Sequence, residues 1–290
     1  MAPLCLAVDI GGTKMAAALV DADGHLEHEA HVPTPHGDAE ATFAALAGLI
    51  GAVRDHASGR PLSVCGVGCG GPMGPGGETV SPLNIAGWRG FPLRRRLADL
   101  TGLATAVDND AKALALGERW KGAAVGCDNF LAMVVSTGVG GGIVLDGRLL
   151  DGRLGNAGHI GHVVVEPDGR RCSCGGYGCL EAEASGSAIA AVTGRPPAEA
   201  APAVITRTGT LVGRAVASVA NLLDLDLALV AGSVALGFGA PFFDAARREL
   251  ARLARMSFSS GTRIEPAGLG AAGPLIGAAA VGWRHLEEPR

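Results

Sequence analysis

The chain has 290 residues, of which 48% are hydrophobic and 18% charged, and its formal net charge is −4 at pH 7. This balance is typical of a folded protein, and the length suits about two domains of ~150 residues each. The slight acidity argues against a nucleic-acid surface, and no uninterrupted apolar run reaches the ~18 residues of a membrane span. The N-terminus lacks a basic region and is interrupted by Asp9, so it is not a signal peptide. We therefore expect a cytoplasmic protein with no nucleic-acid or membrane partner.

The first part of the chain alternates apolar runs with glycine turns. Residues 4–26 predict a β-hairpin, because two apolar runs flank a glycine turn and a D-G turn follows. Residues 41–57 have apolar positions at helical spacing and predict a helix. Next we expect a buried strand from residue 61, a short helix over 91–102, and a strand followed by a helix over 104–120.

A similar order recurs from residue 129 to residue 149, which predict a second strand, glycine turn and strand. Residues 194–203 predict an exposed loop. Helices are expected over 211–225, 242–256 and 274–286, with a strand over 226–233. The repeated pattern predicts two related α/β domains facing each other across a cleft. We expect a smaller domain of residues 1–112 plus 275–290, and a larger domain of residues 113–274.

The segment 155–186 contains a histidine and three cysteines at close spacing: His162, Cys172, Cys174 and Cys179. One imidazole and three thiolates complete a tetrahedral zinc shell with no open position, so the pattern predicts a structural zinc. Glu181 follows the last cysteine by two residues, and the metal would fix where its carboxylate points. The other four cysteines lie in or beside apolar runs and are expected to be reduced thiols: Cys5, Cys65, Cys69 and Cys127.

Two glycine turns could bind phosphate. In the first, Gly11 and Gly12 let the backbone approach a phosphate, Thr13 and Lys14 can donate to it, and Asp9 can hold Mg²⁺. A plain hairpin turn is the alternative. In the second, S-T-G-V-G-G-G at 136–142 could form an anion-binding nest of backbone N–H groups, or simply a tight turn. A G-x-G-x-x-G pattern ends at Gly71, but Pro72 follows and no helix opens there, so we reject a dinucleotide site.

A polar turn at 108–110 lies between the strand and the helix predicted over 104–120. Asp110 stands where the helix begins, and its carboxylate could act as a general base for phosphoryl transfer to a hydroxyl. Asn109 could bind a sugar hydroxyl. The alternative is that this turn only caps the helix, since Asp and Asn are preferred there.

Taken together, these motifs resemble the ROK family of sugar kinases, within the actin–hexokinase–Hsp70 superfamily. The resemblance covers nearly the whole chain: D-I-G-G-T-K at 9–14, the stretch from Asn84 to Trp88, N-D-A at 109–111, the glycine turn at 136–142, and the G-H…C-x-C-G-G-x-G-C-L-E segment. It implies an α/β fold of the two-domain, actin-like ATPase (ribonuclease H-like) type. It also implies domains that close over sugar and nucleotide and so exclude water.

The resemblance implies a role for each matched residue. Asp110 would take the proton of the sugar 6-hydroxyl. Asn84, Asn109, His162 and Glu181 would hold the sugar, and His162 would also bind zinc through its other ring nitrogen. The ATP phosphates and adenosine would be bound by the two turns and a third loop, with Asp9 near Mg²⁺: Asp9, Gly11, Gly12, Thr13, Lys14, Thr137, Gly138, Val139, Gly140, Gly141, Gly142 and Gly232.

One position departs from the family pattern. Glucose-phosphorylating members usually have Glu in A-G-E-x-G-H, whereas this chain reads A-G-H-I-G-H with His159 in that place. A carboxylate accepts hydrogen bonds from two sugar hydroxyls, which a neutral imidazole cannot do. The change is similar to bacterial N-acetylmannosamine kinases, so we expect His159 to favour a 2-acylamino sugar. The alternative is that His159 still binds an ordinary hexose such as glucose.

Other classes remain as alternatives. Some ROK members are sugar-responsive repressors, but the first glycine turn begins near residue 9, where we expect no room for a DNA-binding domain. A sugar sensor without catalysis is opposed by the retained Asp9 and Asp110. Polyphosphate could replace ATP as donor, although no basic track beside the turns favours it. The resemblance also implies a homodimer.

Overall fold

The computed structural model describes residues 2–287. It divides into two compact units. The first contains the described parts of Met1–Gly122, Asp151–Ala157 and Leu269–Arg290, and the second contains Ala123–Leu150 and Gly158–Gly268. Within residues 2–287, no helix has the length and apolarity needed to cross a membrane.

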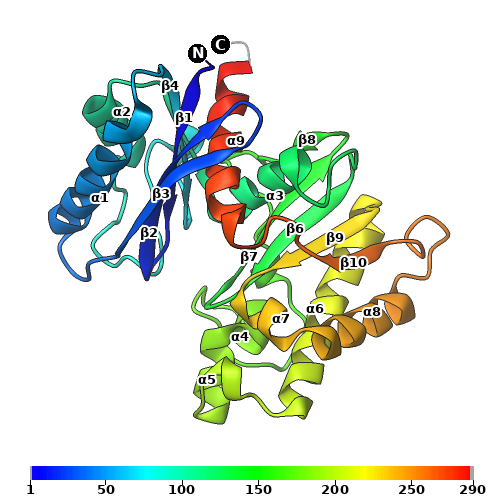
Figure 1. Cartoon of the computed structure of the whole chain (residues 1–290). Helices are drawn as coiled ribbons and strands as arrows, with labels where there is room; N and C mark the ends of the chain where they lie inside the picture. Colours follow the sequence, from blue (N-terminus) through cyan, green and yellow to red (C-terminus); the bar gives the residue numbers. More distant parts are fainter. Residues whose placement is uncertain (1, 288–290) are drawn as a thin grey trace. The chain divides into compact units, whose positions relative to one another are not determined.

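The first unit is built on a five-stranded sheet of order β3-β2-β1-β4-β5 (Figure 1). Strand β1 pairs antiparallel with β2 and parallel with β4, β4 pairs parallel with β5, and β3 pairs antiparallel with β2. The carboxyl ends of β1, β4 and β5 therefore lie at one edge of the sheet. The strand bounds are β1 Leu4–Ile10, β2 Lys14–Asp21, β3 Leu26–Pro33, β4 Leu62–Cys69 and β5 Thr105–Asn109.

Strand β1 is buried on both faces. Its even-numbered residues Leu4, Leu6 and Val8 join a core with α1 (Ala39–Arg54) and α2 (Leu93–Thr101). Its odd-numbered residues Cys5 and Ala7 join another core with α9 (Gly273–Glu287). Because side chains alternate along a strand, Asp9 belongs to the α9 side of the sheet. Helix α3 (Asp110–Lys121) packs against α9 on that same side.

Helix α9 reaches the sheet closely because glycine stands where it crosses. A Cβ on Gly66 of β4 would lie 2.0 Å from the carbonyl oxygen of Ala278. A Cβ on Gly277 would lie 2.6 Å from the carbonyl oxygen of Ala113 in α3. The last helix of the chain is thereby packed between the first unit's sheet and α3.

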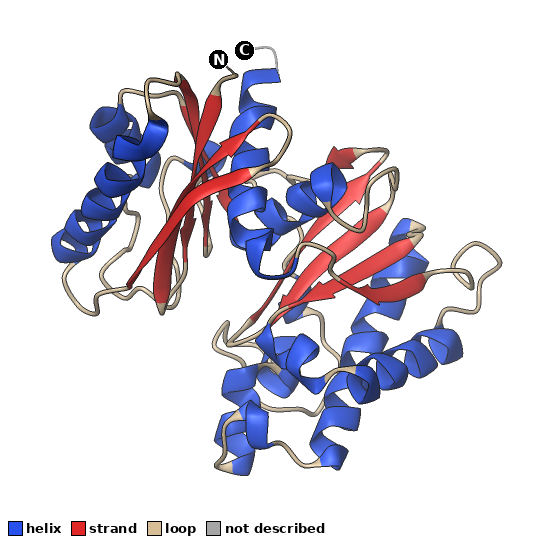
Figure 2. Ribbon diagram, in the orientation of Figure 1, coloured by secondary structure: helices blue, strands red, loops and turns tan. Residues whose placement is uncertain are grey.

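The second unit repeats the strand–turn–strand pattern in a sheet of order β10-β9-β6-β7-β8 (Figure 2). Strands β6 and β7 are antiparallel, and β9 is parallel to both β6 and β10. Alternate residues of β6 (Leu131, Met133 and Val135) face a core shared with the long helices α6 (Pro202–Leu223) and α8 (Ala240–Leu253). The strand bounds are β6 Phe130–Val135, β7 Val139–Leu145, β8 Arg148–Leu149, β9 Leu227–Ala231 and β10 Arg263–Pro266.

The helices of the second unit are α4 Leu180–Ala184, α5 Gly186–Thr193, α6 Pro202–Leu223, α7 Ser233–Phe238 and α8 Ala240–Leu253. Short 3₁₀ turns connect elements in both units: η1 Asp55–Ala57, η2 Pro75–Gly77, η3 Ile160–His162, η4 Pro197–Glu199 and η5 Gly270–Ala272. Helix α6 begins inside the segment expected as a loop over 194–203, and about nine residues before its own predicted start.

Most predicted elements are present, and both hairpins are confirmed. The sequence analysis missed strands β3, β8 and β10 and helices α4, α5 and α7. Strand β3 is an edge strand with polar residues exposed on both faces, so it lacks a two-residue apolar period. The expected domain border at residue 112 falls inside α3, and that at 275 falls inside α9. Both helices belong whole to the first unit, together with 151–157.

Candidate active site

At the carboxyl edge of the first sheet, Asp9 and Asp108 lie on the two strands on either side of Gly68. Asp9 of β1 is the partner of Gly68 in β4, and Gly68 is the partner of Asp108 in β5. A Cβ on Gly68 would lie 3.6 Å from Asp9 Oδ1 and 3.7 Å from the Cα of Asp110. Gly68 thus leaves open the space between the Asp9 carboxylate and the start of α3.

The turn into α3 fixes the backbone that carries Asp110. Asn109 is the N-cap, and its side-chain oxygen accepts a hydrogen bond from the Ala111 N–H at 3.0 Å. Asp110 Oδ1 accepts from the same N–H at 2.9 Å. The capping interpretation is therefore correct for Asn109, while Asp110 is an exposed residue in the first turn, where the helix dipole favours a carboxylate.

The electrostatics of this edge favour a cation. Burial and, as a smaller effect, the charge of Asp110 raise the pKa of Asp9 to about 7, while Lys14 acts in the opposite direction. Burial also raises the pKa of Asp108, against the lowering effect of Lys112. Facing carboxylates that resist ionisation gain the most from a bound cation, because its charge offsets both their burial and their repulsion.

The turn between β1 and β2 is short and held on both sides. Its Gly11 N–H donates to the Lys14 carbonyl at 3.0 Å, and the Thr34 hydroxyl donates to the Gly11 carbonyl at 2.7 Å. A Cβ on Gly12 would lie 2.3 Å from the Cβ of Asn84. Glycine at this position therefore allows Asn84 to pack directly on the turn, while Thr13 and Lys14 stay exposed.

The matching turn of the second unit is shorter than the sequence suggested. Strand β7 begins at Val139, so Gly140, Gly141 and Gly142 are strand residues paired with β6. Only residues 136–138 form the turn. A Cβ on Gly141 would lie 2.9 Å from the Gly158 carbonyl oxygen, so packing explains this glycine without a phosphate.

Glu181 lies against this second turn. Its Oε2 accepts a hydrogen bond from the Val139 N–H at 2.9 Å, and a Cβ on Gly138 would lie 2.8 Å from the same oxygen. Glu181 is in the first turn of α4, whose N-cap is Cys179. The end of the cysteine segment therefore determines where this carboxylate points.

His159 and His162 lie on the short segment that packs on β7. Their rings are stacked with centroids 6.0 Å apart, and both residues are half-buried. A Cβ on Gly161 would lie 2.2 Å from the Val139 carbonyl oxygen, so the segment rests directly on the strand that follows the second turn. The two histidines and Glu181 are thus positioned by the same β-strand.

Gly232 ends β9 at φ +100°, in the region that favours glycine, and its missing side chain lets the Val135 carbonyl approach. The Ser136 and Ser233 hydroxyl oxygens are 3.0 Å apart across this junction. Beside it lies a pocket of about 590 Å³ within the second unit. Its lining is mainly small and apolar, including Ala190, Pro196, Pro197, Ile205, Val234 and Phe238, with Thr137 and Ser233 at the turns.

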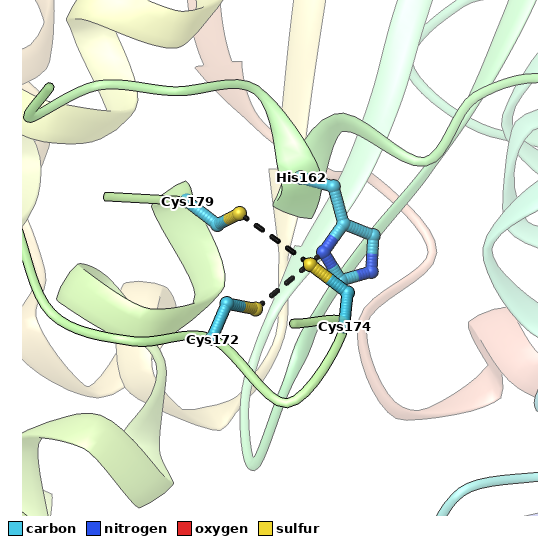
Figure 3. Close-up of side chains that lie close together, drawn as sticks. All are labelled: His162, Cys172, Cys174 and Cys179. Atoms are coloured by element: carbon cyan, nitrogen blue, oxygen red, sulfur yellow. Dashed lines mark hydrogen bonds between the residues drawn. The ribbon is translucent and has the colours of Figure 1, made fainter. Parts of the chain in front are cut away.

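The histidine and three cysteines of the zinc-like segment come together (Figure 3). One ligand atom from each of His162, Cys172, Cys174 and Cys179 lies within 4.8 Å of all the others. His162 Nδ1 is 3.7 Å from Cys172 Sγ, and the sulfurs of Cys174 and Cys179 are 3.8 Å apart. All four residues come from η3, the loop after it, and the start of α4.

These spacings fit a tetrahedral metal. Zinc–sulfur bonds of ~2.3 Å at tetrahedral angles place two sulfurs about 3.8 Å apart, and a sulfur and a nitrogen about 3.6 Å apart. A disulfide would need ~2.05 Å between sulfurs, and all seven cysteines are free thiols. Because Nδ1 faces the sulfurs, the Nε2 of His162 is the ring nitrogen left for another partner. The donor set is therefore that of a closed Zn²⁺ site.

The sequence analysis missed Glu183, which is buried and anchors the cysteine segment. Its carboxylate accepts from the Arg170 N–H at 2.6 Å and from the guanidiniums of Arg170 and Arg207 at 2.8 Å. Burial acts to raise the pKa of Glu183, but these hydrogen bonds and charges hold it below its usual value. Two arginines that are distant in sequence gave no local signal for this contact.

Lys112 was also missed, although the i,i+4 pair with Asp108 is a readable signal. Its side chain is 2% exposed, and its Nζ lies 2.8 Å from Asp108 Oδ1 and 2.7 Å from Asp151 Oδ1.

The structure agrees that the G-x-G-x-x-G pattern ending at Gly71 is not a dinucleotide site. After β4 the chain forms only the three-residue η2 before α2 begins at Leu93, so no helix receives a pyrophosphate.

Comparisons with known proteins agree with this architecture. The model of the ROK family matches residues 5–284. An N-acetylmannosamine kinase of Escherichia fergusonii is 38% identical over 250 residues, covering 81% of this chain and 84% of the relative. A ROK family glucokinase from Streptomyces griseus, solved with glucose and AMPPNP, has a TM-score of 0.84 and 31% identity, covering 97% of this chain and 99% of its own. A ROK hexokinase from Thermus thermophilus has a TM-score of 0.82 and 33% identity, covering 99% and 100%.

These likenesses extend over both units and confirm the α/β, actin-like ATPase fold expected from the sequence motifs. With a family match over almost its whole length, this chain belongs to the ROK family.

Proposed function

We propose that this protein is a sugar kinase that transfers the γ-phosphoryl group of MgATP to the 6-hydroxyl of N-acetylmannosamine. The observation that carries the proposal is the pair Asp9 and Asp110 on either side of Gly68, in a chain 38% identical to an N-acetylmannosamine kinase. One carboxylate of such a pair serves the metal and the other serves the acceptor hydroxyl.

Asp110 is the general base of the proposed reaction. It is exposed at the start of α3, where the Asn109 cap fixes its backbone, so its carboxylate stands at the carboxyl edge of the sheet beside Gly68. Mg²⁺, when bound with ATP, supplies charge neutralisation for the transferring phosphoryl group. Asp9 would hold that ion, and its raised pKa is the cost of keeping a partly buried carboxylate there without a cation.

The nucleotide would be bound by residues of both glycine turns. Thr13 and Lys14 are exposed donors on the first turn, and Thr137 is an exposed donor on the second. The 590 Å³ pocket next to Gly232 has the size and the apolar lining that suit an adenosine moiety. Thr137 lines that pocket and belongs to the second turn, so the adenine base and the phosphates of ATP would be bound by adjoining residues.

The sugar would be held by Asn84, Asn109, His159, His162 and Glu181. Asn84 packs on the first turn, and Glu181 packs on the second. His162 would bind zinc through Nδ1 and a sugar hydroxyl through Nε2, an arrangement in which the metal fixes the tautomer. We propose Zn²⁺ as the structural ion of the cysteine segment; the expected homodimer stays a prediction.

Glucose is the second candidate substrate, because a glucokinase of the same family is 31% identical over 97% of this chain. His159 separates the two candidates. A neutral imidazole has one acceptor nitrogen, so it gives up the two-hydroxyl contact that a carboxylate makes with an ordinary hexose. This loss favours a sugar in which the 2-hydroxyl is replaced by an acylamino group.

The experiment is a coupled ADP-release assay with MgATP and four sugars: glucose, mannose, N-acetylmannosamine and N-acetylglucosamine. We expect the highest kcat/KM with N-acetylmannosamine. A higher kcat/KM with glucose would make the protein a glucokinase with an imidazole in place of the usual carboxylate. Sugar binding without turnover of any of the four would instead indicate a sensor.

A further inference from the structure

Another pocket, of about 360 Å³ and with several charged side chains in its lining, lies within the first unit beside the turn that leads to Asp110. It is lined by the η2 loop, the end of β5, α3, the segment Asp151–Gly155 and the last turns of α9. None of the residues assigned above to sugar, nucleotide or zinc lines it. Its size is that of a small metabolite site.

Four permanent cations converge on this pocket, in a chain whose net charge is −4. Arg94, Lys112, Arg153 and Arg284 line it against two carboxylates, Asp108 and Asp151. The lining therefore has a charge of +2 with His285 neutral, and Glu78, which pairs with Arg94 from outside the lining, lowers this to +1. A positive concave surface on an acidic protein concentrates small anions.

The buried end of the pocket is prearranged. Lys112 directs all three of its N–H donors to fixed acceptors: Asp108 at 2.8 Å, Asp151 at 2.7 Å and the Gly155 carbonyl at 3.1 Å. Arg284 holds the other oxygen of Asp151 at 3.2 Å. Asp108 and Asp151 are thus paired with the protein's own cations, which reduces their repulsion of an anionic ligand.

The outer part of the pocket has donors that the protein does not use. Within residues 2–287, the exposed guanidinium of Arg153 has no hydrogen bond or ion pair with another side chain, and neither does the His285 ring. Arg94, in contrast, donates to the Gly76 carbonyl at 3.1 Å through one nitrogen and pairs with Glu78 through another. Guanidiniums bind planar or tetrahedral oxyanions through paired hydrogen bonds.

We propose that this pocket is a binding site for a small phosphomonoester, separate from the nucleotide and sugar sites, with Arg153 as its principal anchor. A phosphomonoester matches the positive lining better than a neutral sugar does, and its size matches the pocket volume. Asp108, just before Asp110, and Lys112, just after it in α3, both line the pocket, so an occupant would lie next to the element that carries the proposed base.

The test uses the full chain with zinc and isothermal titration calorimetry. The probes are inorganic phosphate, phosphoenolpyruvate and N-acetylmannosamine 6-phosphate, each titrated with the sugar and nucleotide sites first saturated by N-acetylmannosamine and MgAMPPNP. We expect at least one probe to bind under saturation, and Arg153→Ala to weaken that binding by about tenfold. Arg255→Ala removes an equally exposed arginine of the second unit and should leave it unchanged.

Three results would overturn the proposal: no binding of any probe at millimolar concentration, binding that disappears under saturation, or equal affinity in wild type and Arg153→Ala. If inorganic phosphate bound with the same affinity as both esters, the site would recognise only the phosphate group and the proposal of a phosphomonoester site would also be wrong. If neither N-acetylmannosamine nor MgAMPPNP binds, the proposed function fails. The Arg153 comparison still decides the pocket without them.

Discussion

At the scale of single residues, the proposed mechanism depends first on Asp110 as the general base. Replacing it with Asn keeps the oxygen that accepts from the Ala111 N–H, so the helix cap should survive while the base is lost. We expect kcat to fall by roughly 10²- to 10⁴-fold and the thermal midpoint to change little. Steady-state ADP release and thermal unfolding measure the two effects. Asp99→Asn, an exposed change on α2, is the matched control, and a kcat equal in both variants would remove the base role.

His159 carries the proposed sugar preference. Changing it to Glu restores a carboxylate that can accept from two hydroxyls, so the ratio of kcat/KM for glucose to that for N-acetylmannosamine should rise at least about tenfold. His285→Glu, which alters a histidine of the first unit, should leave the ratio as it is. If His159→Glu leaves the ratio unchanged, this residue has no part in specificity.

The ionisation of Asp9 makes the stability of the fold depend on pH. Its pKa rises from 3.8 to about 7 on folding, so the folded state holds a proton that the unfolded state has released between these values. Stability therefore falls as pH rises from about 4 to about 7, by roughly 4 kcal/mol. Asp9→Asn should be more stable than wild type by a margin that grows across this window and is constant above it. Thermal midpoints measured without Mg²⁺ test this, and a margin that shrinks with rising pH would contradict it.

At the scale of elements, the cysteine segment positions two residues that we propose as sugar ligands, because His162 stands at its start and Glu181 just after its end. Cys174→Ser should lower bound zinc from about one equivalent, lower the thermal midpoint, and raise KM for the sugar more than KM for ATP. Cys127→Ser, which removes a half-buried thiol outside the segment, is the control. Wild-type protein that carries no zinc when purified without chelator would contradict the assignment.

The elements also show what could be predicted from the sequence. Strong periodicity and glycine turns predicted both hairpins, and the Cys/His spacing predicted a cluster that the structure brings together. Strand β3 was not predicted, because an exposed edge strand needs no apolar face and its sequence therefore lacks the alternating pattern. Lys112 has a readable i,i+4 partner in Asp108, but its contact with Asp151, like that of Glu183 with Arg207, joins distant parts of the chain that local patterns cannot reveal. Likewise, the close approach of Gly141 to Gly158 could not be predicted from the glycine pattern, because the two residues meet only in the fold.

At the scale of the whole molecule, each unit has its own hydrophobic core, and helix α9 completes the core of the first unit. Gly66→Ala would push a Cβ into the Ala278 carbonyl and separate α9 from the sheet, so we expect a loss of at least about 2 kcal/mol and a midpoint several degrees lower. Gly48→Ala on α1, where a Cβ meets nothing within 4 Å, should instead stabilise by about 0.5–1 kcal/mol. Differential scanning calorimetry distinguishes them, and equal midpoints would refute this role of α9.

The most direct test of the account is to identify the product. Wild-type protein incubated with MgATP and N-acetylmannosamine should yield ADP and phosphosugar in equal amounts, and proton–phosphorus correlation NMR should couple the phosphate to the two protons on carbon 6. Asp110→Asn should give neither product at a comparable rate. ADP without a phosphosugar, or a phosphate on any other carbon, would contradict the proposed placement of the acceptor hydroxyl at Asp110.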